Sequence, residues 1–266
     1  MNGMENAVQA LIAGKSVVVA IWFVLLFAGE RLAPAAMSGG TERPMADRHR
    51  LARNIGLWLA NVALSLAIVV PVSNWAVANS LGFRPEWWTG GWGLLLDLLL
   101  LDFLIYWWHR ANHVWPFLWR FHEVHHLDRF LDTTTSIRFH FGEVMLSALA
   151  RAGVIVLFGI PLASVLAFEA LVLVAALFHH SNLRLPPALE AALARLIITP
   201  SIHWVHHHRR RADTDSNYGT VLSIWDPIFA TRSRTVRSPD MEIGVEATEE
   251  DTLPRLIVRP FLARPG

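Results

Sequence analysis

Histidine recurs in this chain at spacings that suit metal binding. Of its 13 histidines, most fall in four groups: His109 and His113; His122, His125 and His126; His179 and His180; and His203, His206 and His207. The second and fourth groups share the pattern His-x-x-His-His. Residues three and four apart lie on one face of a helix, so each group can direct its imidazoles toward one point. The sequence therefore predicts a metal site.

The number of these histidines exceeds the needs of a single ion. A structural zinc ion takes typically four ligands and a catalytic one three, whereas the groups supply eight or nine imidazoles. This favours two ions. Imidazole binds iron, zinc, copper and nickel, so the ligand type leaves the metal open. A redox-inert pair would favour hydrolysis, and an iron pair would favour oxygen activation.

The composition indicates an integral membrane protein. Hydrophobic residues make up 53% of the chain and charged residues 17%, against about 25% charged residues in ordinary soluble domains. The net charge of +1 argues against a nucleic-acid partner. Cysteine is absent, which excludes disulfides, thiolate zinc sites and an iron–sulfur cluster held by this chain.

Apolar segments predict an all-α bundle of about four to five membrane helices with a histidine-lined cap. The segments are Val17–Ala28, Ile55–Ala78, Trp92–Trp108, Val144–Phe158 and Leu162–Phe178. We expect Pro71 to kink the second, and Gly159-Ile160-Pro161 to form a turn between the last two. The first segment extends back toward Ala7 and is expected to be a retained anchor rather than a cleaved signal peptide.

Arginine placement predicts the orientation. Five arginines follow the first apolar segment, at Arg31, Arg43, Arg48, Arg50 and Arg53, whereas the next loop has only Arg84. The positive-inside rule places the arginine-rich loop in the cytoplasm. Alternation from there puts every histidine group on the cytoplasmic side, in a bacterial inner membrane.

Two alternatives come from other classes of protein. His122-Glu123-x-x-His126 also fits the zinc-peptidase pattern, in which the glutamate is a general base, although a peptidase would leave the other histidines unexplained. A metal transporter would need ligands at midplane depth, whereas these cluster at the ends of apolar segments.

Several stretches together resemble the sterol desaturase/fatty acid hydroxylase superfamily of membrane di-iron oxygenases. They are DFLIYWWHRANHVWPFLWRFHEVHHLDRFLDTTTSIRFHFG (residues 102–142), FHHSN (178–182), TPSIHWVHH (199–207) and DSNYGTVLSIWDPIFAT (215–231). The resemblance covers roughly residues 90–232. The chain departs from the family pattern at Phe141, where proline is frequent, and at Ala230, where glycine is frequent. The resemblance implies two irons at the cytoplasmic membrane surface, which activate O2 to hydroxylate or desaturate a C–H bond of a lipid.

By that resemblance nine histidines are the metal ligands: His109, His113, His122, His125, His126, His180, His203, His206 and His207. His180 is chosen over His179 because the family's histidine directly precedes Ser-Asn, although the residues alone leave the choice open. Imidazole ligands need partners for their second nitrogen, and the expected supporting residues are Asp102, His140, Glu143, Glu169, His179 and Asn182. His140 is equally compatible with a structural role.

The same resemblance and composition predict three regions and an external electron source. Residues 1–90 are expected to hold anchor helices and a basic loop, 91–232 the catalytic domain, and 233–266 a polar, peripheral tail. The chain has no cysteine cluster, flavin fingerprint or His-Pro-Gly-Gly haem motif, so a ferredoxin, rubredoxin or cytochrome b5-like donor with its reductase is implied. Sterol-like, hopanoid and fatty acyl substrates remain open.

Overall fold

This computed structural model describes residues 2–36 and 47–262, with side chains from Gly14 onward except Lys15. The described residues form helices joined by loops. Isolated β-bridges occur, and no strand forms among these residues. The elements are α1 (Asn2–Leu32), α2 (Arg48–Leu64), the π-helix η2 (Ser65–Val69), α3 (Val70–Ala78), α4 (Gly90–Val114), α5 (Pro116–His126), the 3-10 helix η3 (Thr133–Ile137), α6 (Phe141–Phe158), α7 (Leu162–His180), α8 (Pro187–Leu193), α9 (Pro200–His206), α10 (Arg211–Thr214), α11 (Trp225–Ile228), α12 (Leu253–Val258) and η4 (Arg259–Phe261). The predicted all-α fold is confirmed.

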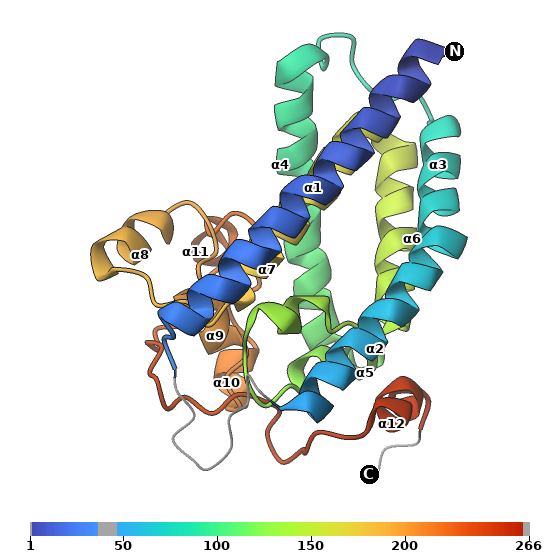
Figure 1. Cartoon of the computed structure of the whole chain (residues 1–266). Coiled ribbons are helices and arrows are strands. Elements are labelled where there is room, and N and C mark those ends of the chain that lie inside the picture. Colours follow the sequence, from blue (N-terminus) through green and yellow to red (C-terminus); the bar gives the residue numbers. More distant parts are fainter. Residues whose placement is uncertain (1, 37–46, 263–266) are drawn as a thin grey trace.

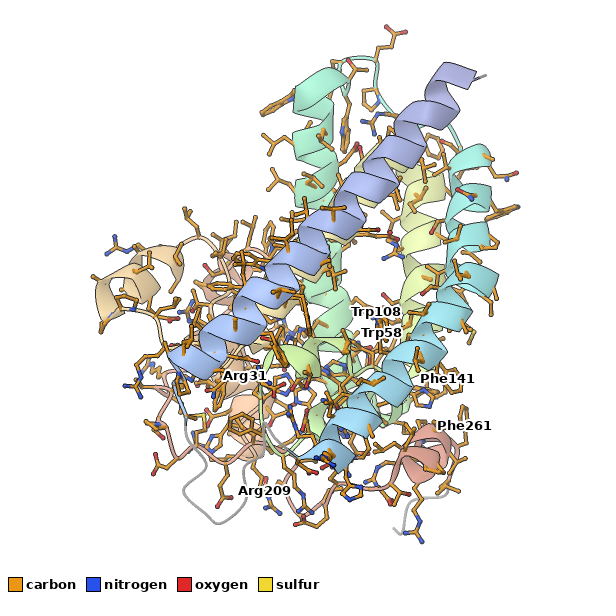
Figure 2. All side chains as sticks on the ribbon, viewed as in Figure 1. Arg31, Trp58, Trp108, Phe141, Arg209 and Phe261 are labelled. Atoms are coloured by element: carbon orange, nitrogen blue, oxygen red, sulfur yellow. The ribbon has the colours of Figure 1, made fainter. Side chains whose placement is uncertain are left out.

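Four helices among the described residues are long and apolar enough to cross a membrane. They are Arg48–Ala78, Gly90–Val114, Phe141–Phe158 and Leu162–His180. In Figure 1 these helices rise as long rods, α1 crosses in front of them, and the short helices gather around the lower half of the molecule. Figure 2 shows that nitrogen- and oxygen-bearing side chains crowd this lower half, near the labelled Arg31 and Arg209. The arrangement is an apolar bundle with a polar cap at one end.

The first of these four helices is distorted just before Pro71, where the sequence predicts a kink. A proline in a helix lacks an N–H group and its ring clashes with the carbonyl of the preceding turn. The five residues Ser65–Val69 form a π-helix just before it. The wider turn relieves the clash, so that α2, η2 and α3 continue as one element to Ala78.

Helix α4 extends beyond its predicted end at Trp108, through His109 and His113 to Val114. It ends there because Trp115 precedes Pro116 and adopts an extended conformation, with φ −92° and ψ 117°. Pro116 then begins α5 at a first-turn position that tolerates proline. Because the chain turns sharply at this point, α5 folds back against α4 and their histidines meet.

A tight turn joins α6 to α7, as predicted from Gly159-Ile160-Pro161. Gly159 caps α6 in the left-handed region, with φ 61° and ψ 42°, a conformation that favours glycine. The turn makes the two helices a hairpin and returns the chain to the cap, where α7 ends at His180.

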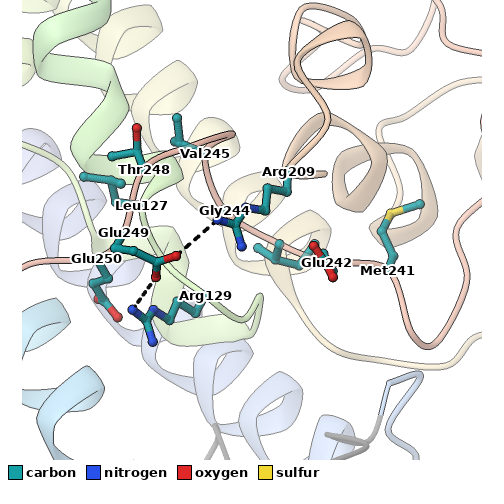
Figure 3. A pocket seen from close by; sticks show the side chains of 11 residues that line it. Leu127, Arg129, Arg209, Met241, Glu242, Gly244, Val245, Thr248, Glu249 and Glu250 are labelled. Carbon is teal, nitrogen blue, oxygen red and sulfur yellow. Dashed lines mark hydrogen bonds and ion pairs between the residues drawn. The ribbon is translucent and has the colours of Figure 1, made fainter.

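The C-terminal segment packs against the cap, in contrast to the expected peripheral tail. Glu250 accepts hydrogen bonds from both Arg53 and Arg138. Figure 3 shows Glu249 bridging Arg129 and Arg209 beside a cavity of about 240 Å³. This segment is therefore part of the cap, and no histidine lines that cavity.

We expect Leu256→Ala to destabilise the cap. Leu256 is 0% exposed and packs with Leu57, Trp119 and Val124; removing such a side chain costs about 2–5 kcal/mol. Thermal unfolding of the purified protein should show a lower Tm. The matched control is Leu262→Ala, since Leu262 is 54% exposed. Equal Tm values for the two variants would show that the segment does not contribute to the cap.

Candidate metal centre

The structure brings the nine proposed ligands together in two adjacent groups. The five-histidine group contains His109, His113, His122, His126 and His206, and the four-histidine group contains His125, His180, His203 and His207. Within each group the ligand nitrogens all lie within 4.8 Å of one another. Eight of the nine side chains are buried and His109 is half-buried. Two groups of this size suit two ions.

The helical periodicity explains why each His-x-x-His-His motif serves both groups. On α5, His122 and His126 are four residues apart and face one group, while His125 faces the other. The second motif divides in the same way: His203 and His207 share one group and His206 belongs to the other. Each motif thus links the two groups.

Hydrogen bonds to the second ring nitrogen fix the protonation of several ligands. The Nδ1 atoms of His109, His125, His180 and His206 lie 2.9, 2.9, 2.7 and 2.6 Å from the carbonyl oxygens of Tyr218, Arg138, Ala176 and Ser216. A carbonyl oxygen only accepts, so each Nδ1 carries the proton. In the neutral imidazole Nε2 then presents a lone pair, which is the form that binds a metal.

The Nε2 atoms face one another at distances that need a cation. His125 and His180 both donate through Nδ1, yet their Nε2 atoms are 3.1 Å apart. Two lone pairs at this distance repel unless a positive charge lies between them. Ligands at 2.0–2.1 Å from one metal ion are separated by about 2.9–3.4 Å, and the pairs His180–His203 and His203–His207 are 3.0 and 3.1 Å apart. The donor set therefore fits a bound metal.

Burial keeps these rings neutral. Desolvation, followed by the proximity of other histidines, lowers the pKa of five of the proposed ligands well below the usual value: His125, His126, His203, His206 and His207. A charged imidazolium cannot bind a metal, so the low pKa favours binding.

Glu143, one of the expected supporting residues, directly contacts a proposed ligand. Its Oε1 lies 2.8 Å from Nδ1 of His122 and 3.3 Å from the Asn112 amide nitrogen. A carboxylate in this position orients the ring and raises its basicity. Asp215 lies near the neighbouring His113, with 3.4 Å between Oδ1 and Nδ1.

Asp102 does not contact a proposed ligand and acts through the loop that orients His109. It is one of the expected supporting residues, but its carboxylate accepts hydrogen bonds from the backbone of residues 221 and 222 and from Trp225. Asp226 accepts from the backbone N–H of Tyr218 at 2.7 Å. Both carboxylates thus hold the loop whose Tyr218 carbonyl orients His109.

The other four expected supporting residues do not contact a ligand nitrogen through the hydrogen bonds that the structure shows. His179 is buried beside the ligands, with its ring centroid 4.0 Å from that of His203, but belongs to neither group. His140 caps α6, accepting from the N–H of Gly142 and donating to the carbonyl of Ile257. The remaining two, Glu169 and Asn182, contact other segments.

Glu169 and Asn182 form hydrogen bonds with residues other than the proposed ligands. Glu169 accepts a hydrogen bond from Arg151 and lies eleven residues before His180, about 16 Å along the helix. Asn182 binds the backbone of Ala36 through both its amide oxygen and its amide nitrogen, at 2.9 Å each. Their spacing from His180 did not reveal these partners, because both contacts are remote in sequence.

A buried ionic network behind the ligands was not foreseen from the sequence. Arg50, counted above as a loop arginine, lies in α2 and binds Asp128 at 2.6 Å and Asp132 at 2.7 Å. Burial favours the neutral carboxyl of Asp128, but Arg50 and Arg138 outweigh it and lower the pKa of Asp128 to about 2. The network fixes the loop between α5 and α6, which ends in the Arg138 carbonyl that orients His125.

The geometry does not support a peptidase. Glu123 would have to face the metal to act as a general base, whereas its Oε2 accepts a hydrogen bond from Arg259 at 3.1 Å. All nine ligands also lie at one end of the bundle rather than along it, which is unlike a transport path.

Comparison with known proteins agrees with this geometry. The fatty acid hydroxylase family model matches residues 94–231, which is more than half of the chain and includes every proposed ligand. The chain belongs to the fatty acid hydroxylase family. The predicted family resemblance is thereby confirmed, and the apolar bundle is that of an integral membrane protein.

Curated relatives in this family act on lipids and lipid-like molecules by their names. An ornithine lipid hydroxylase of Rhizobium tropici is 28% identical over 73% of this chain and 57% of its own length. Alkylglycerol monooxygenases of Caenorhabditis elegans and Homo sapiens are 29% and 31% identical, over 74% and 54% of this chain and 37% and 31% of theirs. The chain thus spans about half or less of these relatives. No solved structure matches it.

We expect Glu143→Gln to weaken metal binding about tenfold, because the amide keeps an acceptor for His122 but loses the charge. Metal affinity measured by competition with a chelator tests this. Glu169→Gln is the matched control, since Glu169 lies about three helical turns from His180. A larger effect at position 169 than at position 143 would contradict the assignment.

We also expect the metal-free protein to lose stability in acid. The buried histidines have lowered pKa values, so below about pH 6.5 the unfolded chain binds protons that the folded chain does not. The Tm should be constant above about pH 7 and fall as the pH decreases through 6.5. Differential scanning fluorimetry after chelation measures this. A Tm that rises on acidification would be inconsistent with neutral, buried rings.

Proposed function

We propose that this protein is an O2-dependent di-iron oxygenase that hydroxylates or desaturates a C–H bond of a membrane lipid. The observation that carries the proposal is the pair of histidine groups, whose Nε2 lone pairs converge at the polar end of an apolar bundle. Family membership supports the same reaction class. The proposed ligands are the nine histidines of the two groups.

Iron is preferred over zinc because of the reaction that the family performs. An unactivated C–H bond lies beyond side-chain acid–base chemistry and requires a redox metal, which supplies electron transfer to O2 when bound. The protein holds the ligands, keeps them neutral and excludes water by burying them. Hydroxylation would consume one O2, two electrons and two protons and release one water molecule with the hydroxylated lipid.

The electrons would come from an external donor. The chain has no cysteine and therefore holds no iron–sulfur cluster of its own. We infer that a ferredoxin, a rubredoxin or a cytochrome b5-like protein with its reductase would deliver them. We place the cap on the cytoplasmic side of a bacterial inner membrane. Arginines crowd the cap, for example at Arg53, Arg129 and Arg209, whereas Arg84 lies at the opposite end of α4.

The substrate would be a lipid whose reacting carbon reaches the metals while its tail stays in apolar surroundings. Ornithine lipid and alkylglycerol are named as substrates of the relatives. We extend to this chain only their common feature, a hydrocarbon chain attached to a polar headgroup.

Two measurements test the proposal. Protein produced in iron-57 medium and purified without chelators should hold about two irons per chain as a coupled pair by Mössbauer spectroscopy. Membranes of expressing cells under oxygen-18 gas should contain a lipid with incorporated label, or a new double bond without it, and His126→Ala should abolish the product. A single tightly bound zinc ion that remains bound in His203→Ala would contradict the di-iron assignment and favour hydrolytic chemistry.

A further inference from the structure

Residues 215–218 run beside the five-histidine group and orient two of its rings through backbone carbonyls. The carbonyl oxygen of Ser216 lies 2.6 Å from Nδ1 of His206, and that of Tyr218 lies 2.9 Å from Nδ1 of His109. Both ligands belong to the same group. One short segment therefore holds two of its five rings in a single orientation.

A third ring of the group, that of His113, has no such partner. Both of its ring nitrogens are buried and form no hydrogen bond with the described residues. A buried nitrogen without a partner costs free energy, so both nitrogens need one. Nδ1 lies 3.4 Å from Oδ1 of Asp215, which leaves Nε2 for a metal ion. An N–H···O hydrogen bond typically measures about 2.7–3.2 Å, so a shift of a few tenths of an ångström would form one.

A carboxylate oxygen within 4 Å of a ring nitrogen distinguishes two of the nine proposed ligands among the described residues. These are His122, beside Glu143, and His113, beside Asp215. Both rings belong to the five-histidine group. A carboxylate that accepts from one ring nitrogen fixes the tautomer and makes the other nitrogen more basic. Asp215 is therefore placed to do for His113 what Glu143 does for His122.

Arg211 holds the Asp215 carboxylate in this position. Its Nε donates to Oδ2 of Asp215 at 2.7 Å, so Oδ1 is the oxygen that faces His113. Its Nη2 donates to the backbone carbonyl of His113 at 3.1 Å. The guanidinium also lies 4.4 Å from the centre of the Trp119 ring, which packs against the His113 ring with centroids 5.0 Å apart. Arg211 thus ties the carboxylate to the histidine beside it.

Folding stability alone does not explain this ion pair. The side chains of Arg211 and Asp215 are 41% and 38% exposed, and exposed ion pairs contribute little to stability because solvent screens them. Both partners nevertheless lie against His113, one at its ring and the other at its carbonyl. The contacts are those of a device that orients a ring.

We infer that Asp215 is a positioning residue for His113: held by Arg211, it accepts a hydrogen bond from Nδ1 so that Nε2 is directed at the metal. This inference rests on the ligand set of the proposed function and adds to it a residue outside that set. Together with the carbonyls of Ser216 and Tyr218, Asp215 makes one segment orient three ligands of the five-histidine group.

The test measures zinc binding, because zinc is redox-inert and binds imidazole whatever reaction the protein performs. The full-length protein in nanodiscs is stripped with a chelator and titrated with zinc against a competing chelator. Asp215→Asn and Asp215→Ala are compared with Glu249→Gln. Glu249 is a matched control because it is an exposed carboxylate that pairs with Arg129 and Arg209 rather than with a histidine.

We expect Asp215→Asn to weaken zinc binding about tenfold and Asp215→Ala up to about a hundredfold. Glu249→Gln should bind zinc like the unaltered protein. The Tm of the chelated protein should change little in all three variants, because the altered carboxylates are exposed. Unchanged zinc affinity in Asp215→Ala, or an equal loss of affinity in Glu249→Gln, would overturn the inference.

A double-mutant cycle asks whether Asp215 acts through His113. In a His113→Ala background, Asp215→Ala should weaken zinc binding no further, because the ring that it orients is gone. The same loss of affinity in both backgrounds would show that Asp215 acts by another route and would overturn the inference.

Lipid analysis separates this result from the proposed function. If the zinc affinities change as expected and no oxidised lipid forms even with the unaltered protein, the proposed function fails and the role of Asp215 stands. If the unaltered protein forms an oxidised lipid and Asp215→Ala binds zinc normally, the proposed function stands and this inference fails.

Discussion

The convergence of imidazole lone pairs inside a buried cap is the constraint on which the rest of the structure depends. The Nε2 atoms of neighbouring neutral rings lie 3.0–3.2 Å apart, and their lone pairs repel each other unless a cation lies between them. Each ring therefore has to be oriented before a metal binds. Backbone carbonyls do this for His109, His125, His180 and His206, and a carboxylate does it for His122. The carbonyl that orients His180 belongs to helix α7, but those that orient His109, His125 and His206 lie outside the helices, so these connecting segments have to be as rigid as the helices.

This requirement explains the polar networks around the cap. Arg50 cross-links Asp128 and Asp132 within the loop that supplies the Arg138 carbonyl, and Asp226 fixes the loop that supplies the Tyr218 carbonyl. Breaking a buried pair leaves an uncompensated charge, which is strongly destabilising. Such networks therefore hold one loop conformation rather than adding much net stability, and through these loops they fix the orientation of the histidine rings.

Periodicity and residue type were sufficient to predict the apolar bundle and the gathering of histidines, whereas the choice of the nine proposed ligands came from the family resemblance. Apolar runs marked the long helices, Gly159 and Pro161 marked the hairpin, and the spacing of the histidines placed them on shared faces. The supporting residues were harder to predict, because spacing along one helix does not reveal contacts with other segments. Glu143 contacts a ligand across 21 residues, whereas Glu169, eleven residues before His180 on the same helix, binds Arg151 instead. Contacts between remote segments leave no periodic signal in one sequence.

The bundle and the cap differ in structure because the bundle is surrounded by lipid and the cap by water. In the bilayer, backbone groups must be satisfied within each helix, so loops cannot orient ligands there. The histidines consequently sit where α4 and α7 leave the apolar region, and loops from the cap reach back to them. Under the proposed function, a metal at this boundary would be reached by a water-soluble electron donor from one side and by a lipid from the other. The same boundary thus determines both how the site is built and which molecules it can serve.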